Sequence, residues 1–344
     1  MSERISGGAT KTGNARRQRG CNVCGPIHNV SWERLPDMPV AKWEPASLVI
    51  DDKLYVLGGY EDNVVSSRRV DVFDPADGSW TQLQDCPSRI SHVDLVEDDS
   101  GFWFAGGMKD KPDRPTKDHI IAEVWHFDPE LDRYTAAPLL PGPRAGGALA
   151  RIDNRLHYVS GLMADRDTDS QDHFVFDLAE WSKTGSADWT RAAPIPTPRN
   201  QHSVGVLNGQ IYIIGGQFNH DSQQLDQALV DIYDPDSDTW SEGPSLPVAH
   251  SHSEGATFVH EDRIWMIGGH STPEGGKKGF CGDVVTLREG EEWEVTCHLP
   301  KPISSPAAKV INDQLYVAGG WDGRRENDDW IMSPEVWTIS VKDL

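Results

Sequence analysis

LYVLGG at residues 54–59 is an apolar run closed by two glycines, and this pattern returns along the whole chain. The copies end at Gly59, Gly107, Gly161, Gly216, Gly269 and Gly320, and in the third of them Ser160 replaces the first glycine. The steps between these glycines are 48, 54, 55, 53 and 51 residues. A β-rich repeat near 50 residues is typical of a propeller, in which each repeat forms one four-stranded blade. The sequence therefore predicts an all-β fold with six blades.

Each repeat continues with an aromatic strand, an Asp-Pro turn and a tryptophan. The Asp-Pro turns begin at Asp74, Asp128 and Asp234, and the aromatic residues that follow are Trp80, Tyr134, Trp189, Trp240 and Trp293. Asp-Pro favours a tight turn, and the tryptophan supplies a large apolar surface between neighbouring sheets. This order of elements closely resembles the Kelch repeat over residues 30–344. The resemblance implies a Kelch-type β-propeller, a fold used mostly for recognition.

The last repeat lacks a fourth strand before the chain ends, and the N-terminal region offers a replacement. Residues 30–36 (VSWERLP) read like residues 238–244 (DTWSEGP), which form the fourth strand of another repeat. We expect this N-terminal strand to complete the last blade, because ring closure removes an exposed sheet edge. The predicted domains are a polar, basic arm at residues 1–29 and the propeller at residues 30–344.

Charge and cysteine content limit the classes of partner. The chain has a net charge of −22, to which residues 1–29 contribute +4, so residues 30–344 carry −26. Such a body disfavours nucleic acid and anionic membranes as partners. The sequence has no apolar run long enough to span a bilayer and no secretory leader, and its five cysteines are scattered, so we expect a cytoplasmic protein. Cys21, Cys24 and His28 have the spacing of half a zinc site, and we interpret the two cysteines as free thiols.

One face of the propeller is predicted to carry function. The turns between first and second strands are tight, whereas all six connections between second and third strands are long, for example residues 108–122 and 321–333. Long loops on a rigid scaffold are typical of a binding surface. Trp321 lies in one of these loops and is a candidate contact for a sugar ring or a peptide.

The mouth of the central channel lies under these loops, and counting back from the glycine doublets gives two recurring levels. The first level holds Lys42, Arg89, Arg144, Arg199, His252 and Ile303. The second holds Pro45, His92, Gly147, His202, Gly255 and Pro306. If these side chains converge, they form a basic mouth suited to a carboxylate or phosphate. The alternative is that the arginines tie neighbouring blades together.

Two functions remain open. The first is a binding module for a protein or peptide on the loop-rich face. The second is an enzyme acting on a small acidic sugar, because six-bladed Kelch proteins include N-acetylneuraminate mutarotase, which this sequence resembles at the level of the repeat. That reading uses Arg89, Arg144, Arg199 and His92 to bind the ligand, and Glu254, Glu44, His202 and His252 to move protons. A transition-metal site is a further hypothesis, with His92, His202, His250 and His252 as candidate ligands. We nevertheless expect no metal and no cofactor.

Overall fold

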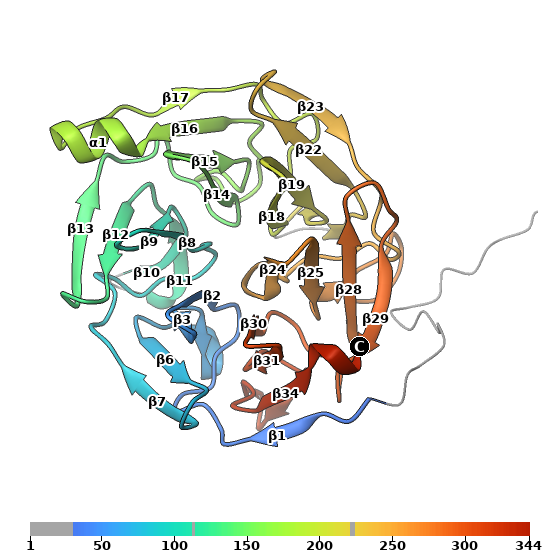
Figure 1. Ribbon diagram of the computed structural model, residues 1–344. Helices are drawn as coiled ribbons and strands as arrows, with labels where there is room; N and C mark the ends of the chain where they lie inside the picture. Colours follow the sequence, from blue (N-terminus) through green and yellow to red (C-terminus); the bar gives the residue numbers. More distant parts are fainter. Residues whose placement is uncertain (1–29, 112–113, 221–223) are drawn as a thin grey trace, which may run out of the picture.

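The computed structural model describes residues 30–111, 114–220 and 224–344. In these ranges six four-stranded antiparallel sheets stand around a central axis, and Figure 1 looks along that axis. The predicted all-β, six-bladed propeller is confirmed. Within the same ranges no helix has the length and apolarity that crossing a membrane requires.

Each blade is a meander whose first strand lines the central channel. Blade 1 contains β2 (Ala46–Ile50), β3 (Lys53–Leu57), β6 (Val70–Asp74) and β7 (Ser79–Gln82). Blade 2 contains β8 (Val96–Asp98), β9 (Gly101–Ala105), β12 (Val124–Asp128) and β13 (Arg133–Ala137). Blade 3 contains β14 (Ala148–Ile152), β15 (Arg155–Val159), β16 (His173–Asp177), α1 (Leu178–Thr184) and β17 (Thr190–Arg191).

The other three blades follow the same order. Blade 4 contains β18 (Ser203–Leu207), β19 (Gln210–Ile214), β22 (Val230–Asp234) and β23 (Thr239–Glu242). Blade 5 contains η2 (Glu254–Ala256), β24 (Thr257–His260), β25 (Arg263–Ile267), β28 (Asp283–Arg288) and β29 (Glu294–His298). Blade 6 contains β30 (Ala307–Ile311), β31 (Gln314–Ala318), β34 (Val336–Ser340) and, as its outer strand, β1 (Glu33–Leu35). The chain ends in the short turn η3 (Val341–Asp343).

The expected closure by the N-terminal strand is confirmed. β1 pairs antiparallel with β34, with Glu33 opposite Thr338 and Leu35 opposite Val336. Trp32 then makes the contact that the outer-strand tryptophans make elsewhere, donating its indole N–H to the His298 carbonyl of blade 5 at 2.9 Å. In the same way Trp240 donates to Ala193 of the preceding blade at 2.8 Å. The first and last strands thus share one sheet, which completes blade 6 and closes the ring.

The glycine doublets are where neighbouring blades approach most closely. Gly58 and Gly59 have φ of +62° and +77°, and a Cβ on Gly58 would lie 2.5 Å from the carbonyl oxygen of Ile90, which leads into blade 2. Only glycine adopts such angles without strain and permits such an approach. In the third copy, where Ser160 replaces the first glycine, the serine has a φ of +62°. Its hydroxyl donates to the Arg199 carbonyl, which precedes the next blade, at 2.7 Å.

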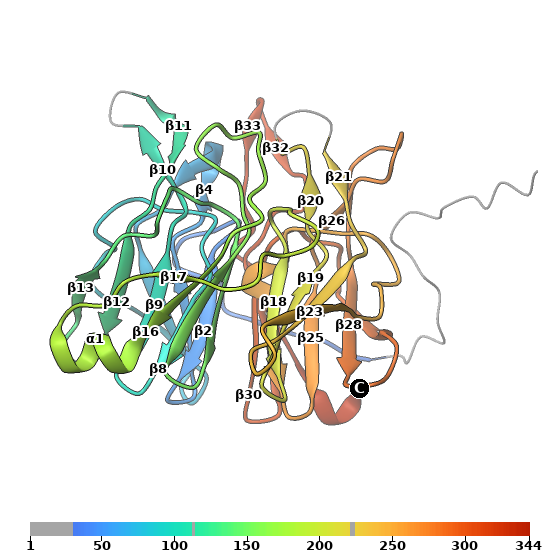
Figure 2. The same cartoon turned by 90° about the horizontal axis from the view of Figure 1, so that it is seen from above.

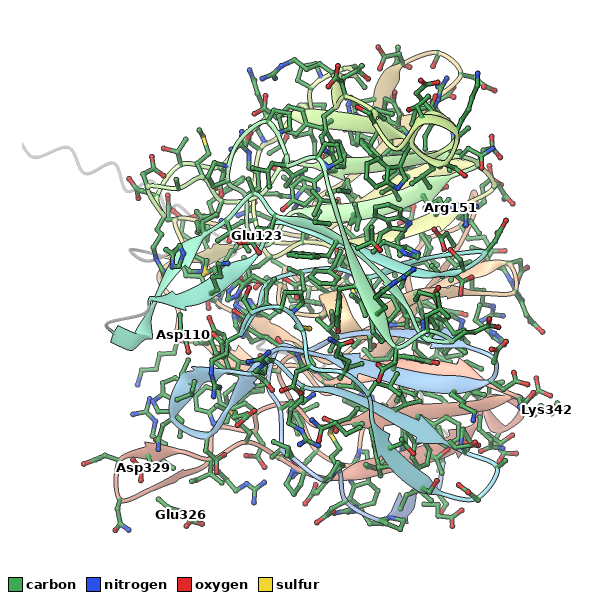
Figure 3. All side chains as sticks on the ribbon, turned by 90° about the vertical axis from the view of Figure 1, so that its left-hand side faces the viewer. Asp110, Glu123, Arg151, Glu326, Asp329 and Lys342 are labelled. Atoms are coloured by element: carbon green, nitrogen blue, oxygen red, sulfur yellow. The ribbon has the colours of Figure 1, made fainter. Side chains whose placement is uncertain are left out.

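Five short β-hairpins extend from one face in the described residues, at the predicted long connections (Figure 2). They are β4–β5 (Tyr60–Glu61 and Val65–Ser66, around η1, Asp62–Val64), β10–β11 (Met108–Lys111 and Arg114–Ile120), β20–β21 (Gln217–Phe218 and Leu225–Asp226), β26–β27 (His270–Ser271 and Gly279–Phe280) and β32–β33 (Arg325–Glu326 and Asp329–Trp330). We call this side the hairpin face and the opposite side, with its tight strand connections, the turn face. Figure 3 shows Asp110, Glu326 and Asp329 at the hairpin face and Arg151 and Lys342 at the turn face.

Candidate functional site

Six residues, one from each blade, surround the channel axis at the hairpin face. They are Glu44, His92, Gly146, Gln201, His252 and Ser305, and we call them the mouth ring. Each has a left-handed backbone, with φ between +45° and +61°. Five backbone hydrogen bonds of 2.8–3.3 Å join neighbours around the ring, each amide donating to the carbonyl of the adjacent blade. A left-handed non-glycine residue costs about 1 kcal/mol, and the hydrogen-bonded ring holds the conformation in place.

A carboxylate between two imidazoles occupies the centre of the mouth ring. Oε2 of Glu44 lies 3.4 Å from Nε2 of His92, and Oε1 lies 3.5 Å from Nε2 of His252. All three side chains are buried, with exposed fractions of 5–6%. The structure therefore brings together three of the residues predicted for ligand binding and proton transfer.

His252 is further connected to a buried carboxyl. Its Nδ1 lies 2.6 Å from the hydroxyl of Ser251, which donates to Asp226 Oδ1 at 2.8 Å, and Gln201 Nε2 lies 3.1 Å from His252 Nε2. Burial, with the nearby His270 ring, holds the pKa of His252 well below its usual value. A neutral His252 accepts from Gln201 at Nε2 and donates from Nδ1 to Ser251, so the hydrogen bonds and the protonation state agree.

The cavity next to the cluster of Glu44, His92 and His252 is small. A cavity of about 10 Å³ touches Glu44, His92 and Gln201 from below, together with Asp94 and Glu254. That volume is close to the minimum for a single water molecule. This cavity is therefore too small for a sugar.

The two predicted levels of the channel need a correction in register. The residue that precedes each bridge to the hairpin face is Lys42, Ile90, Arg144, Arg199, His250 and Ile303, so Arg89 and His252 do not belong to this level. Blade 5 is offset because its bridge, Ser251 to His270, spans 19 residues where the other five span 17. A count back from the glycine doublet therefore selects His252 in blade 5, two positions after the equivalent residue, His250. In blade 2 it selects Arg89, one position before the equivalent residue, Ile90.

The basic side chains of the true level point into the blades. The guanidinium of Arg199 is fully buried and donates to Asp231 and to the carbonyls of Gly215 and Ile213. Arg144 pairs with Asp172, and fully buried Lys42 pairs with Asp71 at 2.9 Å. These contacts are structural, but they join strands of a single blade, whereas the alternative role was to tie neighbouring blades together.

Arg89 is the exposed member of the predicted arginines. It donates one hydrogen bond, of 2.7 Å, to the Ser66 carbonyl on the hairpin face. Its other donors have no partner among the described residues, so it remains available to an anion.

The predicted histidines do not form one cluster. His202 is fully buried, and neither ring nitrogen has a partner in the described part of the chain. Burial lowers the pKa of His202 to about 3 and that of His250 to about 4, so both are neutral packing groups near neutral pH. Among the described residues no group of three or more His, Cys, Asp or Glu is placed to hold a metal ion. Cys21, Cys24 and His28 lie outside the described residues.

Glu254 reaches the channel because of the two extra residues in blade 5. They form the turn η2, in which Gly255 O accepts from Ser47 Oγ of blade 1 and from Lys309 Nζ of blade 6 at 3.0 Å. The Oε1 atom of Glu254 is buried and has no hydrogen-bond partner in the described residues. Burial, reinforced by the Glu44 and Asp94 carboxyls, raises the pKa of Glu254 well above its usual value.

Sequence reasoning missed two charged residues deeper in the channel, Asp94 and Lys309. Both are buried, and burial raises the pKa of Asp94 to about 7 and lowers that of Lys309 to about 7. The available signal was a single lysine within the apolar run AAKVI at residues 307–311, a position at which an apolar strand rarely places a charge.

Trp321 belongs to an aromatic cluster where blades 6 and 1 meet on the hairpin face. Its ring stacks on Trp330 with centroids 4.1 Å apart, and the Trp43 ring lies 5.5 Å from Trp321 and 5.8 Å from Trp330, so the three rings pack against one another. The guanidinium of Arg325 covers the outer side of Trp330 at 4.3 Å. Trp321 is buried, whereas Trp330 is half-buried and Arg325 is exposed, so the last two present this stack to a partner.

Comparisons with known proteins agree with the repeat pattern. A family model described as the KLHDC2/KLHL20/DRC7 Kelch-repeats domain matches residues 146–341, and one described as the Kelch motif matches residues 44–87. The Kelch repeat-containing protein At3g27220 of Arabidopsis thaliana is 25% identical over 343 residues, covering 92% of this chain and 78% of that protein.

Other relatives extend well beyond the match. Kelch-like protein 34 of Homo sapiens is 25% identical over 328 residues, or 89% of this chain but 46% of that protein. Kelch-like protein terF of Aspergillus terreus is 21% identical over 301 residues, or 84% of this chain and 64% of that protein. A solved structure titled "Structure of YjhT" superposes with a TM-score of 0.73 and 15% identity, covering 90% of this chain and 97% of that one. At that identity the likeness shows the fold alone.

Proposed function

The chain belongs to the Kelch-repeat family, whose propellers are typically protein-binding modules, and we propose that this one binds a protein or peptide on its hairpin face. The observation that carries this proposal is the stack of Arg325, Trp330 and Trp321 at the junction of blades 6 and 1. Aromatic and arginine side chains held in a fixed arrangement are the usual anchors of protein interfaces.

The stack is held by hydrogen bonds between two different blades. The Trp330 amide donates to Asn63 Oδ1 at 3.1 Å, and the Met332 amide donates to Asp62 Oδ1 at 2.9 Å. Because η1 of blade 1 thus supports the loop of blade 6, little side-chain entropy remains to be lost when a partner binds. The long connections are also less acidic than the turn face, so the hairpin face repels an acidic partner less.

Panning a random peptide library on the folded protein tests this proposal. We expect clones enriched on the wild type to lose binding at least about tenfold with Trp330→Ala or Arg325→Ala, the effect of removing an anchor. Lys342→Ala, on the turn face, is the matched control and should retain every clone. The proposal fails if no clone is enriched, or if enriched clones bind the Trp330→Ala protein unchanged.

An enzyme acting on a small acidic sugar is the alternative that we propose for the mouth ring. It is supported by the Glu44 carboxylate between two imidazoles, with His252 linked to Asp226 through Ser251. Glu44 and His252 would move protons, and exposed Arg89 would bind the sugar carboxylate. The test is the rate of anomer exchange of N-acetylneuraminate and of glucuronate, followed by NMR. A rate above that of buffer which Glu44→Gln abolishes supports the enzyme, and equal rates refute it.

We further propose a cytoplasmic location. The polar, basic arm predicted at residues 1–29 lies outside the described residues. The location is supported by Cys86 and Cys297, two buried thiols that form no disulfide in the described part of the chain. Cell fractionation of the tagged full-length chain tests it, and recovery from a membrane or secreted fraction would contradict it.

A further inference from the structure

A cavity of about 580 Å³ fills the channel on the side away from the mouth ring. The innermost strands of all six blades line it, namely β2, β8, β14, β18, β24 and β30. Exposed Glu97 and Asp153 mark its end at the turn face, and Glu254 and Gly255 lie at the other end. We call this cavity the channel well. Neither proposed function uses it, because both concern the hairpin face.

The channel well is closed towards the hairpin face by η2. A Cβ on Gly255 would lie 2.2 Å from the Pro45 carbonyl oxygen, so the turn is packed directly against blade 1. Ser47 and Lys309 both donate to Gly255 O and fix the turn from blades 1 and 6. The two-residue insertion in blade 5 thus places Glu254 at the closed end of a pocket that a ligand enters from the turn face.

The two cations that line the well are both engaged by acceptors of the protein. Lys309 Nζ donates to Ser47 Oγ, to Gly255 O and to Ala308 O at 3.0–3.1 Å. Arg151 donates to Asp153 O at 2.8 Å and to Glu97 O at 3.2 Å, and its remaining nitrogen lies 3.6 Å from Asp99. Lys309 therefore has no donor left for an anionic ligand, and Arg151 keeps only the N–H groups that these contacts do not use.

The carboxyls of the well have the opposite character. Asp94 accepts a single long hydrogen bond, of 3.3 Å, from the Leu149 amide among the described residues. Glu254 Oε1 accepts none in the same part of the chain. Buried carboxyl oxygens without donors are unfavourable, and a ligand that brings donors or positive charge relieves that cost.

The wall and the entrance favour the same kind of ligand. Leu48, Val206 and Val310 contribute apolar wall between the polar ends of the well. In the strand connections of the turn face 17 Asp and Glu stand against one Lys, so the potential at the entrance attracts cations. His260 lies near this end as a further polar group of the wall.

We propose that the channel well binds an organic ammonium ion, and that a linear diamine or polyamine fits it best. An ammonium group donates to Asp94 and Glu254 at the closed end, and the methylene chain lies along the valine and leucine wall. Further ammonium groups lie near Glu97 and Asp153 at the entrance. Binding releases the proton of whichever carboxyl is protonated, so the bound pair is ammonium and carboxylate.

Calorimetric titration of the full chain with spermidine and putrescine at 150 mM salt tests the proposal. The matched probes are 1,4-butanediol, which has the length of putrescine without its charge, and succinate, which has the opposite charge. We expect heat of binding with the two amines and none with the other two probes. Loss of a charged hydrogen bond predicts that Asp94→Asn weakens amine binding about 10- to 100-fold. Glu254→Gln should act in the same direction.

Asp236→Asn is the control, because it removes an acidic residue of the turn face outside the well and should change affinity less than about twofold. Circular dichroism of each variant shows whether the fold is intact, and Glu254→Gln replaces Asp94→Asn if the latter does not fold. Equal amine affinity in the wild type and in both well variants means binding to the acidic surface only and overturns the proposal. Tighter binding of succinate, or no heat with either amine, also overturns it.

Discussion

Buried charged residues in this propeller act mainly between strands. Arg199 and Lys42 are fully buried, yet each has a carboxylate and backbone carbonyls around it. Removing one member of such a pair leaves a charge without compensation in a medium of low polarity, which costs far more than the loss of an exposed pair. The residues that were predicted to face a ligand are therefore most informative as stability probes.

Asp231→Ala should destabilise the protein by about 3–5 kcal/mol, because it leaves the buried Arg199 guanidinium without its carboxylate. The control is Glu294→Ala, which breaks the exposed pair with Arg263 and should cost at most about 1 kcal/mol. Urea unfolding measures both. Equal losses would mean that solvent reaches Arg199.

Asp94→Asn should stabilise the protein more at pH 8 than at pH 5. The Asp94 carboxyl has a pKa of about 7 in the fold and 3.8 when unperturbed, so it favours the fold only while protonated. That contribution is complete below pH 3.8 and is lost as the pH rises through 7. Asparagine does not ionise, so the free energy of unfolding that Asp94→Asn gains over the wild type should grow by about 1–3 kcal/mol between pH 5 and pH 8. Urea unfolding at both values measures it, and exposed Asp236→Asn should show no such trend.

The strands lie where the repeat predicts them wherever the distance between glycine doublets and strands is constant. They depart from the prediction where a blade contains additional residues. The period and the N-terminal Trp32 predicted the blades and the closing strand, because both depend on sequence distances that the fold preserves. The level of His252 and Glu254 was wrong by two residues because blade 5 contains an insertion that a count from the doublet cannot detect. Asp94 of blade 2 and Lys309 of blade 6 line the same channel only through the curvature of the ring, so no local pattern relates them.

Gly255→Ala should destabilise the protein by about 1–3 kcal/mol, since the new methyl group would overlap the Pro45 carbonyl oxygen. Gly279→Ala is the control: a Cβ there meets nothing within 4 Å and the change should be near neutral. Chemical unfolding compares the two. A neutral Gly255→Ala would show that η2 is not packed against blade 1.

Deleting the closing strand should weaken the whole ring. A chain that begins at Val30 should keep the unfolding midpoint of the full protein, which also tests residues 1–29 as a separate arm. A chain that begins at Pro36 loses β1 and Trp32 and should lose about 3 kcal/mol, the usual cost of removing a packed tryptophan. Its exposed β34 edge should also promote association, seen by light scattering. Equal midpoints for the two truncations would contradict closure.

On the scale of the whole molecule, charge is unevenly distributed between the two faces. The strand connections of the turn face contain 17 acidic residues and one basic residue, whereas the long connections of the hairpin face contain 18 acidic and 11 basic residues. The composition determines the net charge of the chain, but only the positions of the turns show how that charge is divided between the two faces. Repulsion among the acidic turns competes with local ion pairs such as Lys53 with Asp74 at 2.9 Å.

Raising NaCl from 20 to 300 mM should increase the free energy of unfolding by about 0.5–2 kcal/mol, because added salt screens repulsion across the turn face over distances beyond about 10 Å. Ion pairs respond in the opposite direction, but exposed pairs are worth at most about 1 kcal/mol each. With a net charge of −22, repulsion should outweigh them.

Variants of the two faces show where this effect arises. The turn-face variant combines Glu130→Gln, Asp236→Asn and Glu291→Gln. It should be more stable than the wild type at 20 mM NaCl and respond less to salt. The hairpin-face variant combines Asp167→Asn, Glu274→Gln and Glu326→Gln, and it should respond nearly as the wild type does, because its surroundings are less acidic. Urea unfolding at both salt concentrations measures all three proteins. If salt instead lowers the stability of the wild type, attractive pairs dominate its surface and the turn face is not a source of repulsion.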